Sequence, residues 1–338
     1  MTKEKIFVTG ATGFLGSYLT RNLVNQGFQV RALRRSTSRM DLIADVQDQI
    51  EWIEGDILDI PVLEDAMEGI DKVYHGAAMV SYDPRDHKQM MKVNVEGTAN
   101  IVNVALYRQV KKLGYVSSIA AVGRSAETHI VSEATKWENS KINTKYAISK
   151  HQAEQEVWRG TVEGLPAVII NPTIIIGAGF WNETSCKLFQ RVDEGLKYYT
   201  SGATGFVDVR DTAHILVQLM ESDIENERYI LNGQNKSYFD FFEKVAKALQ
   251  QPTPTTEATP FMKEMVWRAE WLRAKITGKK PLITKETART SSHRYEYLND
   301  KIVKELEYQF RPIDLSIQET AASYLNSKKK GQEFGILT

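Results

Sequence analysis

The sequence predicts an α/β protein, a doubly wound parallel sheet joined to a smaller, mainly helical C-terminal lobe. Three observations support this fold class. Short apolar runs alternate with longer helix-like patterns through the first half of the chain, as in consecutive βαβ units. A glycine-rich turn follows the first apolar run, and beyond about residue 234 the patterns are mainly helical.

Six apolar runs are expected to form buried strands, because each is short and ends at a turn signal. In chain order they are KIFVTG (5–10), QVRALRR (29–35), IEWIEGD (50–56), DKVYHGAA (71–78), KKLGYVSS (111–118) and PAVIINP (166–172). Helices are expected between them, most clearly at 84–111 and 143–163. Right-handed crossovers would place these helices on both faces of a parallel sheet.

After residue 172 the alternation becomes irregular. FVDVRDTAHILVQLM (206–220) indicates a strand and a helix that return to the sheet, and QPTPTTEATP (251–260) indicates a connector. The predicted units are a sheet domain of residues 1–176 and 204–233 and a lobe of residues 177–203 and 234–330. The lobe should face the carboxyl ends of the strands, where open parallel sheets bind ligands.

Bulk composition argues against nucleic acid, metal and membrane-spanning roles. The 338 residues include 43 Lys and Arg and 43 Asp and Glu, so net charge offers no attraction to nucleic acid. Cys186 is the single cysteine and the six histidines are scattered, so neither a disulfide framework nor a metal site is predicted. The longest apolar stretch, 166–180, is interrupted by Asn171 and Pro172 and is too short to span a bilayer. A soluble cytoplasmic protein is expected.

The turn VTGATGFLG places glycines between a predicted strand and a predicted helix. Gly10 would allow the tight turn, Gly13 the approach of a pyrophosphate, and Gly16 the packing of helix against sheet. Free N–H groups at the helix start would bind the anion. The turn therefore predicts a dinucleotide site of the Rossmann type. That site also includes the neighbouring residues Thr12, Phe14 and Leu15.

The end of the second predicted strand indicates which dinucleotide is bound. An NAD site usually has an acidic residue there, which bonds the ribose hydroxyls. This chain has Arg34 and Arg35, and a guanidinium binds a 2′-phosphate that a carboxylate would repel. We predict NADP(H), with NAD(H) as the alternative. If the two arginines have no binding role, they are simply the solvated end of a strand. Asp56 and Ile57, after the third strand, are expected to border the adenine.

A tyrosine followed four residues later by a lysine puts both side chains on one helix face. The pattern occurs four times, at Tyr107/Lys111, Tyr146/Lys150, Tyr297/Lys301 and Tyr324/Lys328. Only YAISK at 146–150 follows the fifth strand, which ends in Ser117 and Ser118. Position therefore selects Tyr146 and Lys150 as the chemical pair, and the others are predicted to be surface pairs.

These groups suit carbonyl reduction, which needs a hydride and a proton. A free phenol has a pKa of about 10, and a nearby ammonium together with an oxidised nicotinamide would lower it. Tyr146 is expected to be the acid or base, and Lys150 to lower its pKa and hold the ribose. Ser118 is expected to hydrogen-bond the substrate oxygen.

Eight motifs occur in a characteristic order: TGATGFLG, GDILD, HGAA, NVEGT, VSSIAAVG, YAISK, NPTIIIG and FVDVRDTA. Together they resemble the extended short-chain dehydrogenases/reductases, the NAD(P)-dependent epimerase/dehydratase family, over nearly the whole chain. The resemblance implies a triad of Ser118, Tyr146 and Lys150, with Ser118 chosen because the family's serine lies five residues before a glycine, here Gly123. It also implies a proton relay through Asn94, for which a helix-packing amide is the structural alternative. The implied coenzyme contacts are Ala77, Ala78, Pro172 and Thr173.

Within this family the chain is most similar to the dihydroflavonol 4-reductase-like branch, which implies an NADPH-dependent reductase of a ketone or aldehyde. VRALRR, NPTIIIG and the stretch from KPLITKETAR to FRPID carry that similarity. One alternative is a nucleotide-sugar epimerase or dehydratase with bound NAD. Such enzymes usually have an acidic residue at the position of Arg34 and an arginine where this chain has SGATG. A second alternative is a non-catalytic NADPH-binding protein, for which Tyr146 and Lys150 would have no use.

Predictions for the substrate side come from less regular parts of the chain. GAGFWNETSCKLF (177–189) is expected to form a lid, with Gly177 and Gly179 as hinges and Phe180 and Trp181 as exposed aromatic surface. The predicted substrate residues are Met79, Ser81, Tyr82, Ser118, Asn171 and Phe180.

The remaining predictions concern surfaces. FMKEMVWRAEWLRAKI (261–276) has an apolar stripe at 262, 265, 269, 272 and 276, which is expected to pack in the core. The alternatives are a roomy apolar pocket and a peripheral membrane face; the latter is disfavoured because the helix lacks a clean cationic side. The family resemblance allows either a homodimer through the helices at 84–111 and 143–163 or a monomer.

Overall fold

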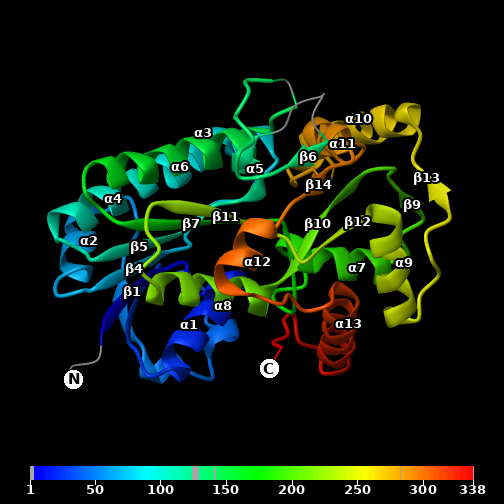
Figure 1. Cartoon of the computed structure of the whole chain (residues 1–338). Helices are drawn as coiled ribbons and strands as arrows, with labels where there is room; N and C mark the ends of the chain where they lie inside the picture. The colour runs from blue at the N-terminus through cyan, green and yellow to red at the C-terminus, as the bar shows by residue number, and fades with distance from the viewer. Residues whose placement is uncertain (1–3, 124–128, 141, 282, 338) are drawn as a thin grey trace.

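The computed structural model describes residues 4–123, 129–140, 142–281 and 283–337. Its centre is a seven-stranded parallel sheet with the order β11-β7-β5-β4-β1-β2-β3 (Figure 1). The strands are β1 (Lys5–Thr9), β2 (Gln29–Arg34), β3 (Glu51–Glu54), β4 (Lys72–His75), β5 (Lys112–Val116), β7 (Ala167–Pro172) and β11 (Glu227–Leu231). The predicted fold class and the six predicted strands are therefore confirmed.

Helices cover both faces of this sheet (Figure 1). One face carries α1 (Phe14–Asn25) and α8 (Val209–Glu221), which pack on each other. The other carries α2 (Ile60–Ala66), α4 (Gly97–Tyr107) and α6 (Lys145–Val162). Because both faces are covered, the central strands are almost wholly apolar; every residue of β7 is buried.

Two elements differ from the prediction. The helix expected at 84–111 is broken into a 3-10 turn (Pro84–Asp86), α3 (His87–Met91), a π-helical turn (Lys92–Glu96) and α4. The strand expected to return to the main sheet, β10 (Ala203–Asp208), instead pairs with β8 (Ile174–Ile176) and β12 (Gln234–Ser237) in a three-stranded sheet. The seventh place in the main sheet belongs to β11, a strand that the sequence did not predict.

The C-terminal part is mainly helical, as predicted, and lies beyond the carboxyl ends of the strands (Figure 1). Its helices are α7 (Lys187–Asp193), α9 (Tyr238–Leu249), α10 (Pro260–Thr277), α11 (Lys285–Thr290), α12 (Asp300–Leu306) and α13 (Ile313–Lys329). Short strand pairs join β6 (Ile130–Val131) to β14 (Glu296–Tyr297) and β9 (Tyr198–Tyr199) to β13 (Thr256–Glu257), and α5 (Ile119–Val122) follows β5.

The stripe on α10 was expected in the core, and this prediction is wrong. Met265, Leu272 and Ile276 are exposed, whereas Ala274 is the buried residue of the described helix. The polar-looking side of α10 is the one that packs on the protein.

The lid predicted at 177–189 is also wrong, because this segment is part of the core. Phe180 and Trp181 are buried rather than exposed. The Trp181 amide donates to the Glu333 carbonyl at 3.0 Å, and the Gly335 amide donates to the Gly179 carbonyl at 3.0 Å. A later stretch, 332–337, therefore covers the segment. Its glycines are packed too: a Cβ on Gly177 would lie 2.4 Å from a Val209 methyl group.

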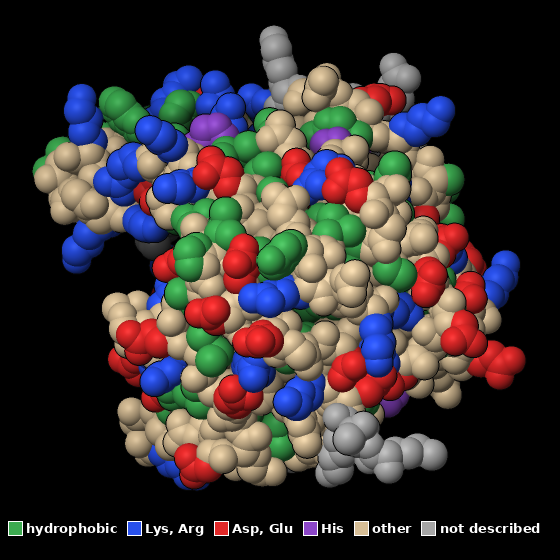
Figure 2. All heavy atoms as spheres, turned by 90° about the vertical axis from the view of Figure 1, so that its left-hand side faces the viewer, with side chains coloured by type: hydrophobic (Ala, Val, Ile, Leu, Met, Phe, Trp, Pro, Cys, Tyr) green, Lys and Arg blue, Asp and Glu red, His purple; other side chains and the backbone are tan. Residues whose placement is uncertain are grey.

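The surface mixes both signs of charge. Figure 2 shows Lys and Arg intermixed with Asp and Glu over one face, with hydrophobic side chains scattered among them and a gathering of Lys and Arg on the projecting part at the upper left. Within the described ranges, no helix is both long and apolar enough to cross a membrane. Among the same residues, no cluster of His, Cys, Asp or Glu could hold a metal ion.

Candidate active site

The glycine turn folds as its spacing predicts. Gly10 leaves β1 with φ of +77°, and a Cβ there would lie 2.7 Å from the Ala77 amide nitrogen. A Cβ on Gly16 would lie 1.9 Å from the Gly10 carbonyl oxygen. Glycine is thus required at both positions, first for a left-handed turn and then for close helix–strand approach.

The start of α1 is open to an anion. Gly13 is the N-cap and contributes no side-chain cap, so the first-turn N–H groups are available to a ligand. Thr12 and Leu15 are partly exposed beside it. Phe14 instead packs edge-on against Tyr18, with ring centroids 6.1 Å apart. The cradle fits a dinucleotide pyrophosphate.

The end of β2 presents a cation on the same edge of the sheet. Within the described chain, the Arg34 Nε atom is buried and has no hydrogen-bond partner, a costly state that an anionic ligand would relieve. Arg35 is exposed. Arg39 lies over the Phe180 ring at 3.9 Å and pairs with Glu333 at 3.4 Å. Phe180, predicted to contact substrate, is therefore beside Arg39.

The residues predicted to border the adenine lie after β3. Asp56 accepts the Leu58 amide at 3.0 Å, which fixes a local turn. Ile57 is buried, and its carbonyl accepts the Asn100 side-chain amide at 3.1 Å.

A buried histidine, not singled out from the sequence, joins the ends of β1 and β4. His75 Nδ1 hydrogen-bonds to Thr9 Oγ1 at 2.7 Å, and its Nε2 to Thr98 Oγ1 at 3.0 Å. Burial, followed by the charge of Lys150, lowers the pKa of His75 to about 3. The imidazole is therefore neutral and structural. The Thr9 hydroxyl also accepts a hydrogen bond from the Ala77 amide at 3.3 Å, which fixes the backbone after β4, where the coenzyme is predicted to bind. Ala78, the next residue, is exposed.

Tyr146 and Ser118 meet at the carboxyl end of β5. Thr144 caps α6 and so begins the helix two residues before Tyr146. Burial raises the pKa of the Tyr146 phenol, Tyr82 raises it further, and a hydrogen bond with Ser118 acts in the opposite direction. The Tyr82 ring lies edge-on to Tyr146, 5.9 Å away between centroids. The partly exposed phenol is thus protonated near neutral pH.

Lys150 is buried one turn further along α6. Its Nζ donates to the Tyr115 hydroxyl at 2.7 Å and to the Val116 carbonyl at 2.9 Å. Burial lowers the pKa of Lys150 to about 7, although Glu154 acts to raise it. Lys150 is not among the groups that shift the pKa of Tyr146 here, and the lowering of that pKa by Lys150 and an oxidised nicotinamide together stays a prediction.

Glu154, which the sequence analysis missed, holds the ends of β5 and β7. It is buried, and its Oε2 accepts the Ser117 hydroxyl at 2.6 Å and the Asn171 amide at 2.8 Å. Asn171 also donates to the Ser118 carbonyl at 3.0 Å. Arg228 balances the charge at 3.2 Å. Ser117 is thereby occupied, while Ser118 faces Tyr146. The missed signal was a glutamate one turn after Lys150, on the same helix face.

Asn94 lies in the π-helical turn and is buried. Its Oδ1 accepts the Met79 amide at 2.7 Å, and its Nδ2 donates to the Met79 carbonyl at 3.0 Å and to Ser149 Oγ at 3.0 Å. These contacts match the packing amide that was the alternative to a proton relay.

Other predicted ligand residues are held by their own loops. The Ser81 hydroxyl donates to Asp86 at 2.6 Å. Pro172 ends β7, and Thr173 Oγ1 donates to the Leu231 carbonyl at 3.1 Å. Met79 is partly buried, and Tyr82, whose ring packs on Tyr146, is exposed.

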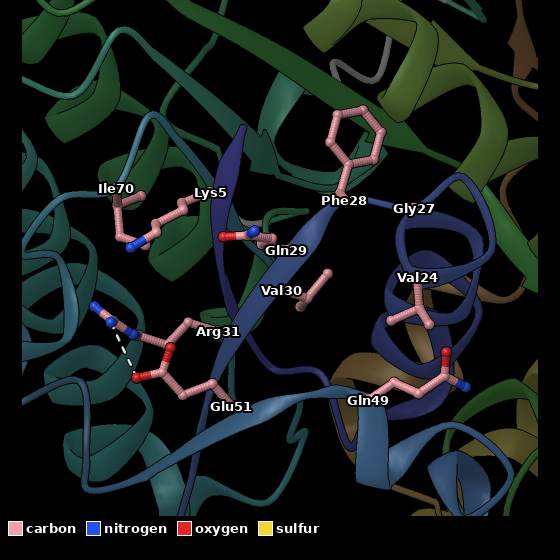
Figure 3. Close-up of a pocket in the computed structure, with 10 residues that line it drawn as sticks. All are labelled: Lys5, Val24, Gly27, Phe28, Gln29, Val30, Arg31, Gln49, Glu51 and Ile70. Atoms are coloured by element: carbon pink, nitrogen blue, oxygen red, sulfur yellow. Dashed lines mark ion pairs between the residues drawn. The ribbon is translucent and has the colours of Figure 1, made fainter. Parts of the chain in front are cut away.

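A surface groove lies elsewhere, away from these residues. It has a volume of about 420 Å³ and is lined at the amino ends of β1 and β2, where Arg31 pairs with Glu51 at 3.0 Å (Figure 3). None of the predicted site residues lines it. Ligands of parallel sheets bind at the opposite, carboxyl ends, so the candidate active site is the one around Tyr146.

A glycine cradle, a free helix end and a tyrosine–lysine helix define a Rossmann-fold, dinucleotide-dependent enzyme. The model of the NAD dependent epimerase/dehydratase family matches residues 6–231. The chain belongs to that family, the extended short-chain dehydrogenases/reductases, and is an NAD(P)-dependent oxidoreductase.

Curated relatives span almost the same length. A Synechocystis sp. protein assigned as a dihydroflavonol 4-reductase is 30% identical, covering 89% of this chain and 88% of its own. Cinnamoyl-CoA reductase 1 of Petunia hybrida is 28% identical, covering 95% and 92%.

Solved structures agree in fold. The crystal structure of gox2253 has a TM-score of 0.81 at 30% identity, covering 98% of this chain and 99% of its own. UDP-glucose 4-epimerase of Thermotoga maritima has a TM-score of 0.78 at 17% identity, covering 96% and 99%, a likeness of fold alone.

Proposed function

We propose that this protein is an NADPH-dependent carbonyl reductase that acts on a ketone or aldehyde. The observation that carries the proposal is the position of Tyr146 beside Ser118 at the carboxyl end of β5, with the Tyr82 ring edge-on to it. Relatives named as dihydroflavonol and cinnamoyl-CoA reductases act on carbonyl compounds by their names, which supports the same class here. When bound, a nicotinamide coenzyme supplies the hydride.

Tyr146 donates the proton in this proposal. A phenol whose pKa is raised by burial keeps its proton at neutral pH and is ready to protonate an oxygen as negative charge develops on it. Ser118 orients the carbonyl oxygen and shares the stabilisation of that charge. The protonated phenol is the form that reduction of a carbonyl requires.

Lys150 holds the coenzyme ribose in this proposal. An ammonium has three N–H donors, and the bonds to Tyr115 and Val116 use two of them. Its pKa near 7 also lets it take up or release a proton close to physiological pH, behind Tyr146.

Arg34 selects NADPH in this proposal. Its buried Nε without a partner and the absence of an acidic side chain at the end of β2 suit a 2′-phosphate, which carboxylates would repel. Arg35, exposed next to it, supplies a second positive charge.

The proposal is tested by following NADPH and NADH absorbance over a panel of ketones, aldehydes, a dihydroflavonol, cinnamoyl-CoA and nucleotide sugars. Reduction of one carbonyl per NADPH consumed is the expected result. Isomerisation of a nucleotide sugar with no net coenzyme change would make the protein an epimerase. Coenzyme fluorescence quenching with no turnover on any panel member would make it a non-catalytic binder.

A further inference from the structure

Helix α10 turns its most apolar face to solvent. Phe261, Met265, Leu272 and Ile276, here called the outer apolar row, are all exposed, with Phe261 and Ile276 at 73% and 76%. At 3.6 residues per turn these four lie within about 60° of one another around the helix. Ala274, on the opposite side, is buried.

Such a row needs a partner. Single exposed apolar residues are ordinary, but these four form two pairs along one face, separated by the turn of Arg268, and such a concentration of apolar surface marks an interaction surface. The helix itself is well defined at both ends, by a Thr259 cap and by Gly278 in the left-handed conformation.

The charges around the row identify the partner's chemistry. Residues 260–281 contain six Lys and Arg and two Glu, in a chain of zero net charge. By helical position, Arg268 and Lys275 flank one side of the row and Arg273 the other. Arg268 pairs with Glu264 at 3.0 Å and Arg273 with Glu270 at 2.8 Å, so six cations and two carboxylates leave an excess of four positive charges in this segment. Long basic side chains can lie along apolar surface while their charges reach outward. Trp271 is exposed beside Lys275, which lies 5.3 Å from its ring centroid.

We propose that the outer apolar row and its flanking cations dock on an anionic lipid surface, with α10 lying in the plane of the interface. This is the alternative that the sequence disfavoured, and the exposure of the row is the observation that now favours it. An apolar stripe bordered by Lys and Arg is the pattern of interfacial helices, and anionic headgroups attract such cations. A second copy of the chain would bring the same positive charges opposite one another, which is unfavourable.

The docked helix adjoins the candidate active site. Arg85 donates to the Gly278 and Lys279 carbonyls, each at 3.2 Å, and Lys280 pairs with Asp86 at 2.6 Å. This turn directly follows Tyr82, which packs on Tyr146. A lipid surface held by α10 therefore lies next to the turn beside the phenol; the relevance of this position to an apolar carbonyl substrate rests on the proposed function.

The test is co-sedimentation of the full chain with vesicles, which needs neither substrate nor turnover. Vesicles of phosphatidylcholine alone are compared with phosphatidylcholine and phosphatidylglycerol mixed at about 2:1. We expect binding to the mixed vesicles that weakens at high salt. We expect Leu272→Ser/Ile276→Ser and, separately, Arg268→Gln/Lys275→Gln to weaken it about tenfold. Val162→Ser, at an exposed valine on α6, is the matched control and should bind like wild type.

NADPH-binding affinity, measured by fluorescence, confirms that each variant is folded. Equal binding to both vesicle types, no binding to either, or unchanged binding of the Leu272→Ser/Ile276→Ser variant would overturn the proposal. So would a dimer in sedimentation that this variant dissociates. Failure of the carbonyl panel would leave the vesicle result unaffected.

Discussion

Helices α6 and α13 carry the same tyrosine–lysine spacing in different surroundings. On α13, Asp193 accepts the Tyr324 hydroxyl at 2.9 Å and the Lys328 ammonium at 2.6 Å, so one carboxylate joins both groups. On α6, Tyr146 bonds Ser118 and Lys150 bonds backbone and a second phenol. The spacing alone therefore brings a tyrosine and a lysine onto one helix face. The groups that face them decide whether a carboxylate bridges the two side chains or whether they remain able to exchange a proton.

The other two occurrences do not form helical pairs. Tyr107 is exposed at the end of α4, and Lys111 pairs with Asp71 at 2.7 Å. Tyr297 is in β14, and Lys301 is on α12. The pair Tyr107/Lys111 is therefore at the surface, as predicted. Tyr297 and Tyr324 are buried, so the prediction of surface pairs is wrong for these two.

The largest effect should come from exchanging the two phenols. Tyr146→Phe removes the proton donor, and we expect kcat for the carbonyl substrate found in the panel to fall about 10³-fold. NADPH affinity should remain, because the glycine cradle is untouched. Tyr324→Phe is the matched control and should keep kcat within about twofold. Turnover by Tyr146→Phe at the wild-type rate would contradict the assignment of Tyr146 as the proton donor.

The next largest effect concerns the arginines at the predicted coenzyme site. The α6 pair is predicted to lie at this site, and the α13 pair is not. Arg34→Asp should lower the ratio of kcat/KM for NADPH over NADH about 10- to 100-fold, because a charge-assisted bond to phosphate is replaced by repulsion. Arg35→Asp should act in the same direction. Steady-state kinetics with both coenzymes provide the measurement. If neither variant changes the ratio, the arginines do not select the 2′-phosphate.

The lowered pKa of Lys150 should make the free energy of unfolding depend on pH. The unfolded chain holds this proton up to a pKa of about 10.4, whereas burial lowers the folded pKa to about 7. Folding therefore releases a proton between these values, and stability rises with pH across that window, by at most about 1.4 kcal/mol per pH unit. Urea unfolding of wild type should show this gain relative to Lys150→Met from pH 7 to 10.

Lys328→Met gives the contrasting curve. Its side chain is 58% exposed, so its removal should leave the slope of stability against pH in that window unchanged. A wild-type curve parallel to that of Lys150→Met would mean that Lys150 is not held in a desolvated state.

The smallest effect isolates the carboxylate of the α13 pair. Burial acts to raise the pKa of Asp193, but the bonds from Lys328 and Tyr324 outweigh it and the pKa is lowered. Asp193→Asn should therefore cost about 1–3 kcal/mol of stability near neutral pH, with kcat unchanged. The cost should disappear as the wild-type carboxylate becomes protonated at acid pH. Thermal unfolding at both pH values measures it; a loss of kcat at full stability would contradict this structural role.

The parts that could be predicted from sequence depend on neighbours along the chain. Gly10 and Gly16 sit in one turn, so their spacing suffices to predict the geometry. Tyr146 could be selected because it follows a recognisable strand. The roles of these side chains in catalysis remain predictions.

The parts that could not be predicted depend on segments far apart in sequence. Phe180 and Trp181 were predicted to be exposed, because nothing nearby shows that residues 332–337 cover them. The stripe of α10 has the periodicity of a core helix, and periodicity does not reveal which face is outward. Lys150 bonds Tyr115, which lies within the predicted strand KKLGYVSS. Nothing in that stretch of sequence indicates that the tyrosine has a charged partner from α6.

The hydroxyl of Tyr18 receives the Leu337 amide at 2.8 Å and donates to the Ala178 carbonyl at 2.8 Å. One phenol on the first helix thus ties together three regions of the chain, the outermost 319 positions apart. During synthesis the bond between Tyr18 and Leu337 cannot form until residue 337 has left the ribosome. The N-terminal half of the nascent chain is therefore without this contact while most of the protein is being made. Closing so distant a contact is slow, and we expect it to be among the last steps of maturation.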